Sequence, residues 1–333
     1  MRRTMWWMGT ALLLAACAGQ PVKTPAPESY TAETTYAKLA PTYPFIRIAS
    51  RAAPPTVRAV TDVTYVRRGA HDLKLDLYLP AAGGTAPRPA IVFVHGGGWR
   101  AGVRANFAPM AIRMAERGYV AATISYRLSL EAPYPAAIID AKAAVRWVRA
   151  HAADYGVDPA RIAIAGGSAG GQIAALAGVT NGEGRFDPDA GPAAVSSAVQ
   201  AIVNIDGLSD FTSEEARRYE DDPGKQPSSA GAWFGGRYAE KAALWRDASP
   251  LYHVNQDTPP LLFIVSAQRR FSLGRDEMVE KLRALGVPNR VVPVPDTPHS
   301  FWLFDPWLAP TVEATDDFLR AYLRRAHYSQ DRE

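Results

Sequence analysis

A serine flanked by glycines stands where a nucleophile could act. Residues 166–170 read Gly-Gly-Ser-Ala-Gly, with Ser168 at the centre. They lie between a predicted buried strand over 162–165 and a predicted apolar helix over 169–179. A sharp turn from strand to helix lifts a serine hydroxyl above the sheet, and glycines beside it avoid the clashes of a Cβ. The pattern predicts Ser168 as a catalytic nucleophile. The alternatives are a plain glycine-rich turn or a phosphate-binding loop, and the latter would need the Walker lysine, which is missing.

A second glycine-rich stretch follows an earlier apolar run. Residues 90–94 read AIVFV, as expected for a buried strand, and residues 95–99 read HGGGW. Bare glycines let the backbone N–H groups of Gly97 and Gly98 point at a substrate oxygen. The N–H of Ala169 would complete an oxyanion hole with them. A tight turn without further role is the alternative.

His299 is the best-placed candidate for a general base. The chain has six histidines, and this one directly follows the last predicted strand, in the segment Pro-His-Ser-Phe, whereas His327 lies near the C-terminus. Nucleophilic serine first and histidine later is the chain order of α/β-hydrolases. We therefore predict that His299 takes the proton of Ser168, with a hydrogen-bonded loop histidine as the alternative.

The HGGGW segment, the GGSAGG segment and the later PHSFWLF segment together resemble the carbohydrate-esterase branch of the α/β-hydrolases. These are relatives of bacterial acetyl-, feruloyl- and pectin methyl-esterase-type enzymes. The resemblance covers roughly residues 60–325. It implies hydrolysis of small acyl or methyl esters, often on plant polysaccharides, without a metal or other cofactor.

The acid that should orient the histidine departs from this family pattern. In most such enzymes the strand before the last ends in a His-Gly-x-x-Asp-type segment. Here residues 265–270 read VSAQRR, and Arg269 stands about where that aspartate belongs. We expect Asp276, at the start of the next predicted helix, to supply the acid. Asp206, at the end of a predicted strand, and Asp296, just before the histidine, are the alternatives, as is a dyad without an acid.

Three side chains are candidates for substrate contacts. Arg269 and Arg270 follow a predicted strand at the edge of the expected pocket, and arginine suits bidentate recognition of a carboxylate. This favours a uronate-rich substrate such as pectin, with an ordinary surface arginine as the alternative. Trp99 could stack on a sugar ring, although buried aromatic residues more often form core.

Strand and helix signals alternate from about residue 59 onward. Residues 63–66 and 73–79 alternate apolar and polar side chains, which is typical of an opening antiparallel hairpin. The alternation that follows predicts a mostly parallel sheet covered by helices on both faces, and the resemblance specifies the α/β-hydrolase fold. Residues 207–258 break the rhythm and are predicted to form an insertion over the C-terminal edge of the sheet, where such sheets bind ligands. Strands are predicted at 90–94, 120–126, 162–165, 199–205, 261–266 and 290–294, and helices at 106–117, 135–151, 169–179, 276–285 and 311–325.

The N-terminal region is typical of a targeting signal. Two arginines precede a short apolar stretch, and residues 14–17 read Leu-Ala-Ala-Cys, which resembles a bacterial lipobox. We predict a lipoprotein signal peptide over 1–17 that leaves Cys17, the only cysteine, lipid-modified; ordinary signal cleavage is the alternative. Residues 18–58 are rich in proline and are predicted to be a tether, before a catalytic domain over 59–333. The expected location is the bacterial cell envelope, lipid-anchored, at the outer membrane or facing the periplasm.

Composition narrows the function classes. The chain has 333 residues, 21% of them charged, and a formal net charge of only +4. The basic residues are interspersed with acidic ones, whereas nucleic-acid binding favours a clustered basic face. We expect a small-molecule or polysaccharide ester as substrate, the membrane as the other partner, and no nucleic acid. A serine peptidase of the prolyl-oligopeptidase type and a non-catalytic binding lipoprotein remain the alternatives.

Overall fold

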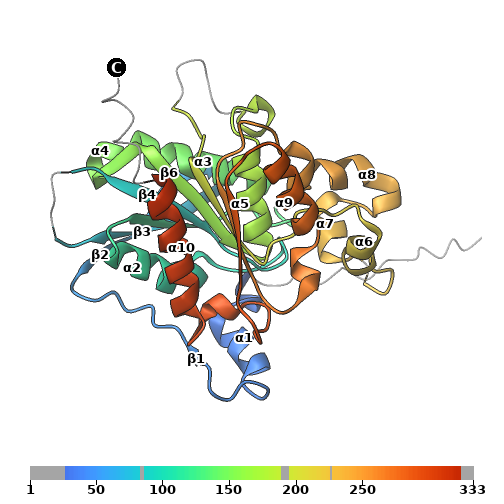
Figure 1. Ribbon diagram of the computed structural model, residues 1–333, viewed down its shortest axis with the longest axis horizontal. Coiled ribbons are helices and arrows are strands. Elements are labelled where there is room, and N and C mark those ends of the chain that lie inside the picture. Colours follow the sequence, from blue (N-terminus) through green and yellow to red (C-terminus); the bar gives the residue numbers. More distant parts are fainter. Residues whose placement is uncertain (1–26, 83–85, 189–194, 226, 324–333) are drawn as a thin grey trace, which may run out of the picture.

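The computed structural model describes residues 27–82, 86–188, 195–225 and 227–323 of the chain. An eight-stranded sheet runs through the molecule in the order β2-β3-β5-β4-β6-β7-β8-β9 (Figure 1). The β2–β3 and β3–β5 pairs are antiparallel, and every later pair is parallel. The predicted hairpin and mostly parallel sheet are therefore confirmed. The strands are β2 (Val57–Arg68), β3 (His71–Pro80), β4 (Arg88–Val94), β5 (Val120–Ile124), β6 (Val157–Gly167), β7 (Ala201–Ile205), β8 (Leu261–Val265) and β9 (Asn289–Pro293).

Helices cover both faces of this sheet. Side chains of α2 and α10 pack in the core on one face, and those of α3, α5 and α9 pack on the other (Figure 1). Successive residues of a strand point to opposite faces. Ile91 and Phe93 of β4 accordingly join the first core, and Val92 and Val94 join the second. The helices are α2 (Ala108–Glu116), α3 (Ala136–Ala150), α4 (Ala152–Tyr155), α5 (Ala169–Val179), α9 (Arg275–Ala284) and α10 (Leu308–Leu323).

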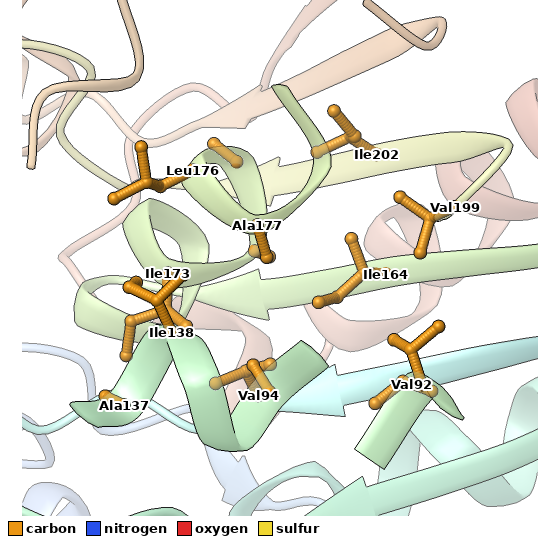
Figure 2. Close-up of a cluster of buried hydrophobic side chains, with 14 of the residues drawn as sticks. Val92, Val94, Ala137, Ile138, Ile164, Ile173, Leu176, Ala177, Val199 and Ile202 are labelled. Atoms are coloured by element: carbon orange, nitrogen blue, oxygen red, sulfur yellow. The ribbon is translucent and has the colours of Figure 1, made fainter. Parts of the chain in front are cut away.

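Helix α5, which follows Ser168, is buried along its whole length. Figure 2 shows Ala177 of this helix facing Ile164 of β6, and Ile173 beside Ile138 of α3. A Cβ on Gly178 would lie 2.4 Å from a side-chain carbon of Ile202 in β7, so this helix lies unusually close to the sheet. That packing fixes the N-terminus of α5, and with it the backbone of Ser168.

The described residues of the predicted insertion between β7 and β8 include the short α-helices α6 (Glu214–Glu220), α7 (Ser229–Phe234) and α8 (Tyr238–Asp247) and the 3-10 helix η4 (Pro250–His253). Its aromatic side chains form a buried cluster. The Trp233 ring stacks on Trp99 at 4.9 Å between centroids, and Phe234 packs against Trp245 at 4.8 Å. The insertion is thereby held against the loop that follows β4.

The prediction that residues 18–58 form a tether is wrong for residues 32–49, which are part of the folded domain. Residues 32–39 form helix α1 (Ala32–Leu39), whose N-terminus is capped by Thr31 and Thr34. Strand β1 (Arg47–Ile48) then pairs with β10 (Phe304–Asp305). Ile46 and Ala49 are buried in the core beside α10. Capping, pairing and burial outweigh the proline-rich composition, so this N-terminal segment (residues 27–50) is part of the domain. Cys17 lies outside the described residues.

Candidate active site

Ser168 occupies the turn between β6 and α5 in a backbone conformation that few non-glycine residues adopt. Its φ is 57° and its ψ is −124°. The turn is held because the Ser168 N–H donates to the carbonyl of Ile205 at 2.8 Å. A Cβ on Gly170 would lie 2.1 Å from the carbonyl oxygen of Val94. Only glycine permits that approach, and the strained serine is presented at the C-terminal edge of the sheet.

The hydroxyl of Ser168 meets His299. His299 Nε2 lies 2.8 Å from Ser168 Oγ, and His299 Nδ1 lies 3.0 Å from Asp206 Oδ2. The Asp206 side chain is fully buried and that of His299 is 17% exposed. The second carboxylate oxygen of Asp206 accepts the N–H of Ser266 at 2.8 Å. The structure thus brings the two predicted residues Ser168 and His299 together in one hydrogen-bonded chain, with Asp206 at its end.

The prediction of Asp276 as the acid is wrong because of its position. Its side chain is 59% exposed and pairs with the neighbouring Arg275 at 2.7 Å. Asp206 follows β7 directly, and β7 is the hydrogen-bonded neighbour of β6, with Gly167 paired to Ile205. Adjacent parallel strands end at the same edge, so the residue after β7 lies beside the serine after β6. Asp276 instead lies in the first turn of α9, with its side chain exposed to solvent.

The other alternative for the acid, Asp296, is exposed and has a φ of 56° in the turn after β9. Among the described contacts of His299, only Asp206 provides a carboxylate.

The predicted oxyanion residues line the same cleft as Ser168 and His299, a space of about 380 Å³. Gly97 has a φ of 123°, and a Cβ on it would lie 2.0 Å from the carbonyl oxygen of Ala101. In the described part of the chain, neither Gly97 nor Gly98 donates its N–H to another backbone carbonyl outside a helix or strand. Ala169 is the first residue of α5, so its N–H has no partner within the helix. Three donors are therefore available beside the serine.

His95 begins the glycine-rich loop but does not face the cleft. Its ring is buried and stacks on Tyr126 at 4.4 Å between centroids. Its Nδ1 lies 2.8 Å from the carbonyl oxygen of Gly96. Burial lowers the pKa of His95 to about 4, so the ring is neutral at physiological pH. It holds the loop in place.

The comparisons with known proteins agree with this geometry. The sequence model of the BD-FAE family matches residues 75–270 of the chain. This chain belongs to the BD-FAE family. The match begins in β3, spans the HGGG loop, Ser168 and Asp206, and ends at Arg270.

Named relatives of this BD-FAE protein are ester hydrolases. It is 34% identical to the probable carboxylic ester hydrolase LipM of Mycobacterium tuberculosis over 73% of this chain and 56% of that protein. It is 33% identical to esterase LipQ of the same organism over 69% of this chain and 55% of that protein. The chain thus spans a little over half the length of these relatives. These relatives belong to the esterase class that the sequence predicts for this chain.

Solved structures give the same result over most of their lengths. Esterase 2 of Thermogutta terrifontis with butyrate bound has a TM-score of 0.64 at 27% identity, covering 80% of this chain and 94% of that one. A truncated carbohydrate esterase from gut microbiota has a TM-score of 0.65 at 26% identity, covering 81% and 98%. The predicted α/β-hydrolase fold is confirmed.

Of the three predicted substrate contacts of this BD-FAE protein, Trp99 and Arg270 line the cleft and Arg269 does not. Trp99 lines the cleft, but its side chain is buried against Trp233 and its indole N–H donates to Gln172 at 2.9 Å, so the ring is not a free stacking surface. Arg269 is 69% exposed outside the cleft and pairs with Glu215. Arg270 lines the cleft.

Two features of the site were missed in the sequence. The Phe271 ring stacks on the His299 imidazole, with centroids 3.5 Å apart and planes 9° from parallel. Ser29, Tyr30 and Lys38, from the N-terminal segment, line the cleft. The signal for α1 was present as the Thr31–Thr34 capping box, but neither contact follows from local sequence.

Proposed function

We propose that this protein is a serine carboxylic-ester hydrolase that acts through Ser168, His299 and Asp206. The observation that carries the proposal is the hydrogen-bonded chain of these three side chains, with distances of 2.8 and 3.0 Å. It ends in a cleft that also presents the backbone N–H groups of Gly97, Gly98 and Ala169. Nucleophile, base, orienting acid and oxyanion donors are the complete set that acyl transfer requires.

The proposed reaction runs in two halves. Ser168 Oγ attacks the ester carbonyl while His299 Nε2 takes the hydroxyl proton, and the carbonyl electrons move to the oxygen. That oxyanion accepts hydrogen bonds from the three backbone N–H groups. The intermediate collapses, the C–O bond to the alcohol breaks, and His299 returns the proton to the leaving oxygen. Water then attacks the acyl-enzyme by the same steps, which releases the acid and regenerates Ser168.

Hydrolysis of p-nitrophenyl acetate tests this function. We expect turnover by the protein and a rate at the uncatalysed level for Ser168→Ala. A fluorophosphonate probe should label the wild type on a peptide that contains Ser168 and should leave Ser168→Ala unlabelled. Unchanged turnover in the variant, or labelling of another serine, would contradict the proposal.

We further propose that the substrates are acyl or methyl esters of plant polysaccharides that carry a uronate. The cleft is lined by the cations Lys38, Arg100 and Arg270, while Glu220 and the engaged Asp206 are its acids. Glu220 lies 3.4 Å from Arg270, and burial raises the pKa of this carboxyl above its ordinary value, which disfavours its negative charge. The Arg270 guanidinium has further N–H groups besides the one that contacts Glu220, and these would bind a carboxylate on the substrate.

Arg270→Gln tests the substrate class, and Arg269→Gln is its matched control because Arg269 lies outside the cleft. The measured quantity is kcat/KM on a uronate-containing ester relative to a neutral ester of similar size. We expect Arg270→Gln to lower this ratio about tenfold, as for loss of one charged hydrogen bond. The control should leave it unchanged. An equal ratio in the wild type and both variants would refute uronate recognition.

We also propose that the protein is anchored to the bacterial cell envelope through a lipid on Cys17. The support is the lipobox-like sequence Leu-Ala-Ala-Cys. No helix among the described residues is long and apolar enough to span a bilayer. Cys17→Ser should abolish incorporation of labelled palmitate and shift the protein from the membrane to the soluble fraction. Palmitate incorporation that persists in the variant would exclude this anchor.

A further inference from the structure

The N-terminal segment holds the stretch that follows His299 at three points. The Tyr30 hydroxyl shares a hydrogen bond of 2.8 Å with Ser300 Oγ. The N–H of Ala49 donates to the carbonyl of Leu303 at 3.1 Å. Strand β1 pairs with β10, with Arg47 opposite Asp305 and Ile48 opposite Phe304. Residues near the two ends of the sequence thus contact each other in the stretch that immediately follows His299.

Of these three contacts, the Tyr30–Ser300 hydrogen bond lies nearest to His299 in the sequence. Ser300 is the next residue after His299, is buried, and has a φ of 71°, a conformation that non-glycine residues seldom adopt. Such a conformation persists only where its surroundings hold it. Burial raises the pKa of the Tyr30 phenol, so its hydroxyl remains protonated and available for the hydrogen bond.

The backbone of Tyr30 is fixed by a second contact. Its carbonyl accepts a hydrogen bond of 3.0 Å from Asn106 Nδ2. Asn106 is buried and belongs to the short 3-10 helix η2 (Arg104–Phe107), which follows the loop that carries Gly97 and Gly98. Tyr30 therefore links η2, which follows the glycine-rich loop, to the residue after His299, and it lines the cleft itself.

We infer that Tyr30 is a positioning residue that holds His299 in register with Ser168 through its hydrogen bond to Ser300. The inference rests on the proposed esterase function. Without this hydrogen bond, Ser300 loses the side-chain partner that stabilises its positive-φ backbone conformation. Nε2 of His299 then spends less time within reach of the Ser168 hydroxyl, which lowers kcat more than it changes KM.

Tyr30→Phe removes one oxygen and keeps the ring. With p-nitrophenyl acetate we expect kcat to fall about threefold to tenfold, the range for one buried hydrogen bond, with KM within about twofold. Ser300→Ala should give a similar loss, and the double variant should lose no more than either single variant, because both remove the same bond. Tyr36→Phe is the matched control. Tyr36 lies in α1, outside the cleft, and has no described side-chain hydrogen bond, so kcat should not change.

A second measurement is independent of turnover. The proton between His299 Nδ1 and Asp206 should give a downfield NMR resonance, and we expect this resonance to broaden or move in Tyr30→Phe and to stay unchanged in Tyr36→Phe. Absence of wild-type turnover would count against the proposed function alone. The role of Tyr30 would be overturned if Tyr30→Phe had the kcat of the wild type and an unchanged resonance. Additive losses of kcat in the double variant would overturn it as well.

Discussion

Replacing Asp206 by asparagine isolates the charge of the acid while keeping its shape. In the Asp206→Asn variant the amide carbonyl oxygen can still accept the Ser266 N–H, which Asp206 Oδ1 accepts at 2.8 Å. The amide NH₂ would then face His299 Nδ1 and force that nitrogen to be the acceptor. The proton would sit on Nε2, where the imidazole cannot take the proton of Ser168.

The size of the effect follows from the geometry. During proton transfer the imidazolium and the carboxylate are 3.0 Å apart, with side-chain exposures of 17% and 0%. At an effective dielectric constant of about 20, two unit charges at that distance attract each other by about 5.5 kcal/mol. Such an energy corresponds to a factor of about 10⁴ in rate. We therefore expect Asp206→Asn to lower kcat on p-nitrophenyl acetate by about 10³ to 10⁴-fold.

Asp276→Asn is the matched control, because Asp276 is exposed and pairs with Arg275. Its kcat should remain within about twofold of the wild type. Melting temperatures of both variants should show that the fold is intact. A loss of less than about tenfold in Asp206→Asn, or a larger loss in Asp276→Asn than in Asp206→Asn, would refute the assignment of the acid.

Three further predictions concern the loop that begins at His95. Gly97→Ala should lower kcat at least about 100-fold or prevent folding, because its Cβ would meet the Ala101 carbonyl oxygen at 2.0 Å; activity assays and circular dichroism distinguish the two results. Since the pKa of His95 falls from 6.5 to about 4 on folding, the unfolded chain binds more protons between these values, and stability is lost as pH falls through that window. Urea denaturation should show about 2 kcal/mol of this loss between pH 7 and pH 5, and the loss should be missing in His95→Gln. Trp99→Phe leaves the buried Gln172 oxygen without its indole donor and should lower the free energy of unfolding by about 1–3 kcal/mol, measured by the same method.

Residues that are required by the backbone geometry of a local turn could be predicted from the sequence. Ser168 and Gly97 stand in turns that require particular residue types wherever they occur, so their short motifs carry the information. His299 could be placed because the chain order of serine and histidine follows from the order of strands in the fold. The alternation of strands and helices likewise reflects local periodicity, and it predicted the sheet.

What the sequence left open depends on which elements become neighbours. Asp206 follows a strand and Asp276 lies in the first turn of a helix, and only the pairing of β7 with β6 places one of them beside the serine. Trp99 was judged by its residue type, but the insertion supplies Trp233 to bury it. Tyr30 lies in a region whose composition indicated a tether, yet β1 pairs with β10 and brings that region to the histidine. Contacts between distant segments are set by the packing of the whole chain, which no local pattern encodes.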